Sequence, residues 1–201
     1  MSQKPSLDFW YEFASPYSYL AAMRIEAEAQ KANFDINWKP FLLGPIFRQH
    51  GYQDSPFNEL PTKRNYMWRD IKRCCQTQGL AFHQPDPFPC NALNAARLAL
   101  LGVKLGWCPQ FTRSVFEAHF GQGKDISDPN ILKSILTSVT RDDVERLWDQ
   151  AQSPDHKNCL RTQTEHAQSL GIFGAPTFMR EQEMFWGNDR LEMALTFQPE
   201  T

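Results

Sequence analysis

The chain has 201 residues, which suffice for one domain with a full core or for a small domain that carries a large insertion. Its 21 basic and 23 acidic residues nearly balance and form no basic stripe, which disfavours nucleic acid and anionic membranes as partners. No stretch approaches the ~18–20 apolar residues of a membrane span, and the N-terminal residues lack the pattern of a secretion signal. We therefore expect a soluble cytoplasmic protein.

The first 40 residues alternate between strand and helix signals. Apolar and polar residues alternate over 7–13, which predicts a strand, and Trp10 indicates that the second face of this strand is partly covered. Ser15 followed by proline is typical of a helix start, and apolar residues at helical spacing predict a helix over 16–32. Alternation returns over 34–38 before a proline. The chain is therefore predicted to open β-α-β.

The next ~125 residues change in character, because helix-forming runs are interrupted by Pro, Gly and Asn rather than by alternating strands. Six helices are predicted here, over residues 61–78, 91–105, 109–120, 129–138, 141–150 and 153–169. Strand signals return after residue 171, with strands predicted over 177–180 and 183–186 and a short helix from 188 to about 195. This β-β-α tail is predicted to complete the sheet that the N-terminal strands begin.

Cysteines and histidines, five of each, are scattered along the chain. The cysteines are odd in number and none forms Cys-x-x-Cys, which favours reduced thiols in a reducing compartment. No two histidines stand at i, i+3 or i+4, so we expect no metal site.

The stretch FASPYSYL, residues 13–20, places two serines where a thioredoxin-like redox protein carries the two cysteines of its Cys-x-x-Cys motif. Ser15 stands at the start of the first predicted helix, where unpaired backbone N–H groups favour an anion. It can be an ordinary helix N-cap. Alternatively, because no His or Asp is placed to activate it as a nucleophile, its hydroxyl can steady the anion of a bound molecule.

The stretch GIFGAPTF, residues 171–178, puts a proline immediately before a predicted strand. We predict a cis peptide bond between Ala175 and Pro176, which leaves the backbone of Ala175 free to pair with an extended ligand. The alternative is an ordinary proline between a loop and a strand.

The stretch FWGNDRLEMAL, residues 185–195, turns a strand into a helix. Asn188 can cap this helix, and Asp189 can offset the helix dipole from its first turn. Alternatively, the carboxylate of Asp189 can hold the amine of an amino-acid zwitterion whose own carboxylate takes the helix end.

Taken together, SPYSYL, GIFGAPTF and FWGNDRLE, with NYMWRDIKR between them, resemble the glutathione-dependent 2-hydroxychromene-2-carboxylate isomerases and the kappa-class glutathione transferases. The resemblance covers nearly the whole chain. It implies a thioredoxin-like α/β fold with a large all-helical insertion domain, related to the periplasmic disulfide oxidoreductases. The thioredoxin-like domain would then comprise residues 1–43 and 170–201, and the insertion residues 44–169.

The same resemblance implies a glutathione site. Ser15 matches the serine that hydrogen-bonds the glutathione sulfur, so the reactive thiol comes with the cofactor. Ala175 and Pro176 match the turn whose backbone pairs with the cysteinyl unit. Lys63 resembles a lysine near the glycine carboxylate, although Arg64 stands where the family has glycine. The segment that holds the γ-glutamyl end is matched by Trp186, Gly187, Asn188 and Asp189.

On the substrate side the matches are less specific. Asn58 stands near the place of an asparagine that family members use at the site, and Asn91 resembles a substrate-side residue but can equally cap the helix that follows. Four aromatic residues can line the pocket or belong to the core: Phe41, Phe47, Tyr66 and Trp68.

The function implied is glutathione-dependent cis–trans isomerisation of an aromatic keto acid during aromatic catabolism, by reversible addition of the glutathione thiolate to an alkene. A kappa-type glutathione transferase or peroxidase is the alternative from another reaction class. A non-catalytic glutathione-binding protein is the third. The resemblance also implies a small-molecule substrate and a homodimer.

Overall fold

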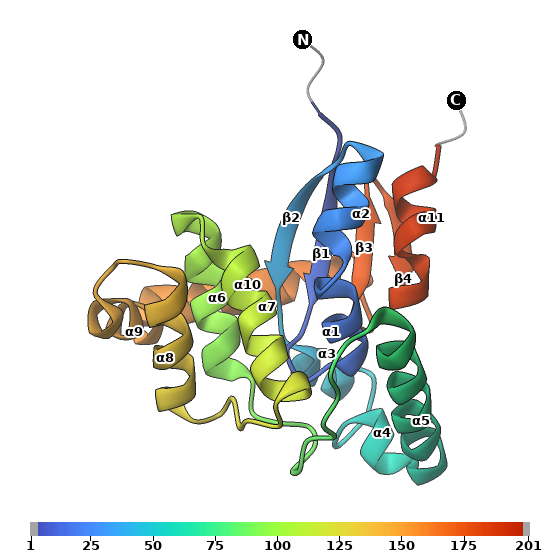
Figure 1. The fold of residues 1–201 in the computed structure, drawn as a ribbon, viewed down its shortest axis with the longest axis horizontal. Coiled ribbons are helices and arrows are strands. Elements are labelled where there is room, and N and C mark those ends of the chain that lie inside the picture. The colour runs from blue at the N-terminus through green and yellow to red at the C-terminus, as the bar shows by residue number, and fades with distance from the viewer. Residues whose placement is uncertain (1–3, 199–201) are drawn as a thin grey trace.

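The computed structural model describes residues 4–198 and contains one four-stranded sheet with helices on both faces (Figure 1). The strand order is β2-β1-β3-β4. β1 (Ser6–Tyr11) runs parallel to β2 (Asp35–Pro40) and antiparallel to β3 (Thr177–Arg180), which pairs antiparallel with β4 (Glu183–Trp186). The C-terminal strands thus complete the sheet that the N-terminal strands begin, as predicted.

The single helix predicted over residues 16–32 is wrong, because the chain bends at Met23 and Arg24. α1 (Pro16–Ala22) and α2 (Ile25–Ala32) are separate helices, and Arg24 has φ −122° and ψ −17° between them. Its side chain bonds to Asn188, 164 positions along the chain. Such a tertiary contact overrides the local helix propensity and leaves no trace in the helical spacing.

The helices between β2 and β3 follow the predicted pattern, with two additions. The short α3 (Leu43–Gln49) and α4 (Pro56–Glu59) were not predicted. The helix predicted over 109–120 is α7 (Cys108–Phe116) followed by a π-helical turn (Glu117–Gly121). The others are α5 (Pro61–Gln78), α6 (Leu93–Leu105), α8 (Pro129–Val139), α9 (Val144–Gln152) and α10 (Pro154–Ser169).

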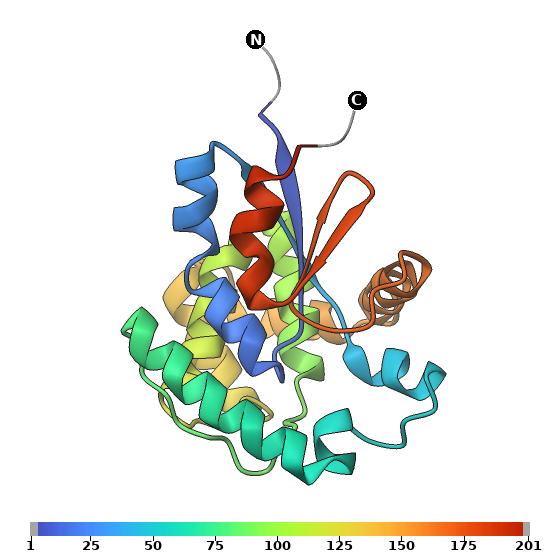
Figure 2. The same cartoon turned by 90° about the vertical axis from the view of Figure 1, so that its right-hand side faces the viewer.

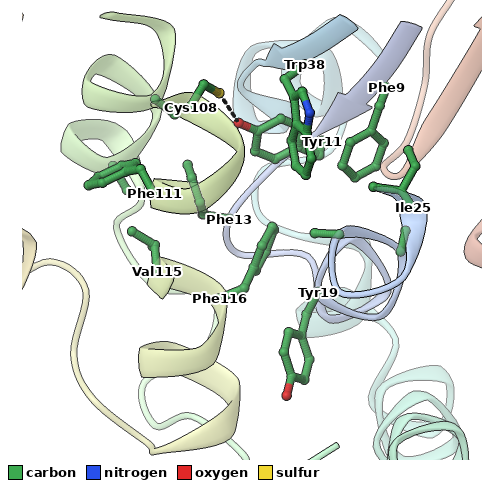
Figure 3. Close-up of a cluster of buried hydrophobic side chains, with 14 of the residues drawn as sticks. Phe9, Tyr11, Phe13, Tyr19, Ile25, Trp38, Cys108, Phe111, Val115 and Phe116 are labelled. Carbon is green, nitrogen blue, oxygen red and sulfur yellow. Dashed lines mark hydrogen bonds between the residues drawn. The ribbon is translucent and has the colours of Figure 1, made fainter. Parts of the chain in front are cut away.

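One face of β1 packs against α1 and the insertion helices (Figure 3). Phe9 and Tyr11 stack with ring centroids 5.0 Å apart, and Phe13 meets Phe116 from α7 at 5.0 Å. The Tyr11 hydroxyl is bonded to Oγ1 of Thr112, 2.7 Å away. The first strand is therefore joined to the insertion through a shared core. The division of the chain into two domains stays a prediction.

The other face of the sheet is covered by α3 and α10, opposite α1 and α2 (Figure 2). Trp10 is fully buried there, as the sequence pattern indicates, and its ring lies 5.9 Å from that of Phe41. Phe41, a candidate pocket wall, is itself fully buried in this second core. An aromatic residue just after a strand is as consistent with a core as with a pocket, so the pattern alone cannot separate the two.

Within the described residues, no helix is both long and apolar enough to cross a membrane. The same part of the chain holds no cluster of three or more His, Cys, Asp or Glu residues that could hold a metal ion.

Candidate functional site

Ser15 lies where α1 begins and is bonded on two sides. Its backbone is extended (φ −87°, ψ 114°), and its Oγ accepts a hydrogen bond from the backbone N–H of Ser18 at 3.2 Å, so the predicted N-cap is confirmed. The same hydroxyl donates to the carbonyl oxygen of Ala175, 2.9 Å away. The side chain is 8% exposed. The fold therefore brings the first and second motifs together at this hydroxyl.

The loop before β3 has the geometry that its sequence predicts. The peptide bond between Ala175 and Pro176 is cis, as predicted. The hydroxyl of Thr177 donates to the carbonyl of Gly174 at 2.9 Å, and the carbonyl of Pro176 accepts from the N–H of Gly187 at 3.0 Å. This loop therefore contacts both Ser15 and the third motif.

The second serine of the motif is inaccessible. Ser18 is fully buried, and its Oγ accepts a bond from the backbone N–H of Glu12 at 3.5 Å. With serine at both positions, the motif has no thiol and cannot form an internal disulfide. A thiol that reacts beside Ser15 must come from a bound molecule or another part of the chain.

Trp186 and its neighbours form the exposed rim beside the cis-proline loop. Trp186 is 52% exposed and its ring lies 4.8 Å from that of Phe173. The indole covers Gly174 so closely that a Cβ there would fall 2.4 Å from the indole nitrogen. Gly187 has φ 115°, and a Cβ on it would fall 2.5 Å from a carboxylate oxygen of Asp189. The absence of a side chain at Gly174 and Gly187 therefore lets the Trp186 indole and the Asp189 carboxylate lie close to the backbone at the rim.

The predicted capping role of Asn188 is wrong. Residues Asn188–Arg190 form a 3-10 turn, and α11 (Leu191–Thr196) begins after it without a side-chain cap. The Asn188 side chain is buried and accepts a hydrogen bond from Nε of Arg24 at 3.1 Å. Asp189 is exposed, and its carboxylate pairs with the neighbouring Arg190 at 2.9 Å. The carboxylate is therefore accessible to a ligand.

Helix α5 lies beside α1 and carries Lys63 in its first turn. The Lys63 side chain is exposed, with its ammonium 5.6 Å from the centre of the Phe57 ring. Farther along α5, Asp70 accepts a 2.8 Å hydrogen bond from the hydroxyl of Tyr17, which lies between Pro16 and Ser18 in the first motif. The sequence patterns did not single out Tyr17 or Asp70.

Cys74 is the cysteine of α5 on the side of Asp70 and Asp189. Burial raises the pKa of its thiol, and the nearby carboxylates of Asp70 and Asp189 raise it further, against a smaller opposite effect of Arg24. The thiol is therefore protonated near neutral pH and is a poor nucleophile.

Two of the predicted substrate-side residues, Asn58 and Asn91, have different hydrogen-bond partners. The Asn58 side chain donates to Asp54 at 2.8 Å and to the carbonyl of Phe88 at 3.3 Å, and accepts from Arg64 at 3.3 Å. Arg64, the departure from the family pattern, therefore binds the asparagine. Oδ1 of Asn91 accepts from the N–H of Leu93, the first residue of α6, at 3.2 Å, but the N-cap position is occupied by Ala92, which forms no side-chain cap. Asn91 therefore contacts the start of α6 from the position before the N-cap.

The remaining candidate wall residues differ in exposure. Phe47 is half-buried, with its ring 6.2 Å from that of Tyr52. Tyr66 is 62% exposed, whereas Trp68 is buried against Phe88 at 4.7 Å. A cavity of about 380 Å³ is lined by Trp68 and lies on α5 and the following loop, and another of about 400 Å³ lies among α3, α6 and α10. Neither cavity is lined by Ser15 or Ala175.

Glu12, three residues before Ser15, is a titratable group that sequence reasoning missed. Burial raises the pKa of its carboxyl to about 7, against a smaller opposite effect of a hydrogen bond from the backbone of Ala14. The backbone carbonyl of Glu12 accepts from the N–H of Ser15 at 3.0 Å. A carboxyl group that titrates near neutral pH therefore lies next to the motif.

Comparisons with known proteins show a family and several similar proteins. Residues 6–197 match the DSBA-like thioredoxin domain family. The 2-hydroxychromene-2-carboxylate isomerase of Sphingobium xenophagum is 27% identical over 187 residues, which cover 93% of this chain and 94% of that protein. Glutathione S-transferase kappa 2 of Caenorhabditis elegans is 25% identical over 213 residues, covering 100% of this chain and 94% of that one.

A solved structure of a 2-hydroxychromene-2-carboxylate isomerase superposes with a TM-score of 0.85 at 25% identity, covering 94% of this chain and 91% of that one. The expected thioredoxin-like fold with a helical insertion is therefore confirmed. The relatives are isomerases and glutathione transferases, which supports enzymatic activity in this protein. The match over residues 6–197 shows that the chain belongs to the DSBA-like thioredoxin domain family.

Proposed function

We propose that the protein is a glutathione-dependent cis–trans isomerase of the 2-hydroxychromene-2-carboxylate isomerase type. The observation that carries the proposal is the hydroxyl of Ser15, held 2.9 Å from the Ala175 carbonyl in a motif without cysteine. Relatives of nearly the same length are named as such isomerases. The proposed substrate is an aromatic keto acid with a conjugated alkene.

The residues of the site fit a thiol peptide. The Ser15 oxygen accepts from the Ser18 N–H and has one rotatable hydrogen, which now points to Ala175. If this hydrogen turns toward a sulfur anion, the Ala175 carbonyl loses its donor. An amide N–H of an extended ligand can replace it. The hydrogen bond between the Ser15 hydroxyl and the Ala175 carbonyl can thus be replaced by two bonds to a cysteinyl unit, one to its sulfur and one from its amide N–H.

The ends of the tripeptide would be held by charged residues. Asp189, whose carboxylate is accessible, would bind the γ-glutamyl amine beside Trp186, Gly187 and Asn188, and Lys63 would bind the glycine carboxylate. Phe47, Asn58 and Asn91 remain proposed substrate-side residues. We also propose a homodimer in the cytoplasm.

Bound glutathione would supply a thiolate that adds reversibly to the alkene, so that the carbon–carbon bond can rotate before the thiolate leaves. The proposed role of Ser15 is to donate a hydrogen bond from its hydroxyl to the sulfur anion, which stabilises the thiolate and so lowers the pKa of the bound thiol. Because α1 has only seven residues, we assign this effect mainly to the hydroxyl rather than to the helix dipole.

The alternatives share the same glutathione contacts. The similarity to kappa-class glutathione transferases supports transfer of glutathione to a substrate as the second candidate. This reaction would consume the thiol, because the sulfur stays bound in the conjugate. The test is incubation with glutathione and either a hydroxybenzylidenepyruvate or a chloro-nitrobenzene, with free thiol measured throughout. Isomerisation without loss of thiol is expected. Stoichiometric conjugate formation would instead identify a transferase, and binding without turnover a non-catalytic binding protein.

A further inference from the structure

Arg24 lies at the bend between α1 and α2, a position that no motif singles out. α1 ends at Ala22 and α2 begins at Ile25, so the bend turns the side chain of Arg24 toward the 3-10 turn before α11. The side chain is only 19% exposed. A long cationic side chain that is held this far from solvent requires partners for its guanidinium group.

The partners all lie on the turn and on the helix that follows it. Nε of Arg24 donates to Oδ1 of Asn188 at 3.1 Å, and Nη2 donates to the backbone carbonyl of the same residue. The guanidinium also pairs with the carboxylate of Glu192 through both terminal nitrogens. Arg24 therefore binds a backbone atom, a side-chain atom and a carboxylate within one short segment.

These contacts fix the turn from one side, and the cis-proline loop fixes it from the other. The N–H of Gly187 donates to the carbonyl of Pro176 at 3.0 Å, so the residue before Asn188 is tied to the loop beside Ser15. Asp189 follows directly, and its only hydrogen-bonded side-chain partner in the described structure is the adjacent Arg190. The place of the Asp189 carboxylate is thus set by its backbone, which Arg24 and Pro176 hold.

We infer that Arg24 is a positioning residue that sets the specificity of the site for the γ-glutamyl portion of its thiol ligand. The inference rests on the proposed function, in which Asp189 binds the γ-glutamyl amine. Because Glu192 neutralises the guanidinium, Arg24 positions the turn without competing for the Asp189 carboxylate. Lysine cannot replace it, since a single ammonium cannot reach all three acceptors with the geometry of the guanidinium fork.

The test compares glutathione with cysteinylglycine, which lacks the γ-glutamyl unit, by NMR titration of parent, Arg24→Gln and Arg24→Lys. We expect Arg24→Gln to raise the Kd for glutathione about tenfold. Without Arg24 the turn shifts, and the Asp189 carboxylate loses its hydrogen bond to the γ-glutamyl amine, which is remote from the thiol. The Kd for cysteinylglycine should stay within about twofold of the parent value. Arg24→Lys should behave similarly, and it carries the comparison if Arg24→Gln does not fold.

A matched control is Arg113→Gln, which removes another partly buried arginine, one that pairs with Glu26 of α2 rather than with the turn. It should change neither Kd. Equal weakening of both ligands by the Arg24 variants, or no change in either, would overturn the inference while leaving the proposed function intact. A parent protein that binds no glutathione would overturn the proposed function and the inference with it.

Discussion

The hydroxyl of Ser15 and the carbonyl of Ala175 are hydrogen-bonded at 2.9 Å although 160 positions separate the two residues. The bond joins the start of α1 to the cis-proline loop, and the loop in turn bonds to Gly187. Three motifs that are far apart in sequence therefore meet at one edge of the sheet.

Ser15→Ala should raise the pKa of bound glutathione thiol by about one to two units, because one hydrogen bond to the sulfur anion is lost. Turnover near neutral pH should fall about tenfold to a hundredfold, while glutathione affinity changes little. Loss of the N-cap should cost ~1 kcal/mol of stability as well. Thiolate absorbance, titrated in the glutathione complex, measures the pKa directly.

Ser18→Ala is the control for that substitution, since it removes a buried hydroxyl of the same motif. Among residues 4–198 this hydroxyl accepts only from the N–H of Glu12. It should leave the thiol titration unchanged. Superimposable titration curves for parent and Ser15→Ala would reduce Ser15 to a helix cap.

Asp189→Asn should weaken glutathione binding about tenfold or more, because it removes the charge that binds the ligand amine. It should change the free energy of unfolding by less than ~0.5 kcal/mol, since Asp189 is exposed and forms an ion pair with its neighbour Arg190. Calorimetric titration and denaturant unfolding measure the two effects. A glutathione affinity equal to that of the parent would reject the γ-glutamyl role.

Glu12 should make folding depend on pH. Burial raises the pKa of its carboxyl from 4.5 to about 7 in the folded state, so its protonated form favours folding. This stabilisation is complete below pH ~4.5 and is lost as pH rises through about 7. The loss should be on the order of 2 kcal/mol, a value reduced because the Glu12 side chain is partly exposed to solvent. Denaturant midpoints at pH 5 and 8 should show a smaller difference in Glu12→Gln than in the parent. Equal differences in the two proteins would mean that other groups cause the dependence.

Gly174→Ala should destabilise the protein by about 1–3 kcal/mol, because the new Cβ would lie 2.4 Å from the indole nitrogen of Trp186. The half-exposed indole can swing away, which favours the lower end of this range. In a Trp186→Ala background the same substitution should cost much less, as a double-mutant cycle of unfolding free energies would measure. If the cost is the same in both backgrounds, the backbone rather than the indole is responsible.

Local signals predicted the parts of this protein that local forces determine. Alternation over β1, the capping serine before α1 and the proline before β3 each act within a few residues, and each was confirmed. The bend at Arg24 could not be predicted in this way, because the side chain at the bend bonds to Asn188 from the other end of the chain, a contact that helical spacing does not encode. The same bond explains why Asn188, a good capping residue by type, is not used as one.

In the candidate site, too, local sequence signals located some residues, whereas tertiary contacts determine others. The motifs located Ser15, Ala175 and Asp189, and the fold brings their segments together. Residues that act through a neighbouring element, such as Asp70 with Tyr17, carry no signal of their own in the sequence. Phe41 shows the converse case, since its residue type fits a pocket wall and the fold buries it under α3 and α10.

The position of β1 between β2 and β3 also has a consequence for synthesis on the ribosome. β2 can pair with β1 early, but β3 emerges only after all the helices from α3 to α10. At ~5–20 residues per second, roughly 8–30 s pass between the synthesis of Ser15 and that of Ala175. During this interval one edge of the central strand has no partner, which is the kind of surface that attracts other unpaired strands. Until β3 pairs with β1, this edge of β1 therefore has to be kept from pairing with other strands, and the contact between Ser15 and Ala175 cannot form.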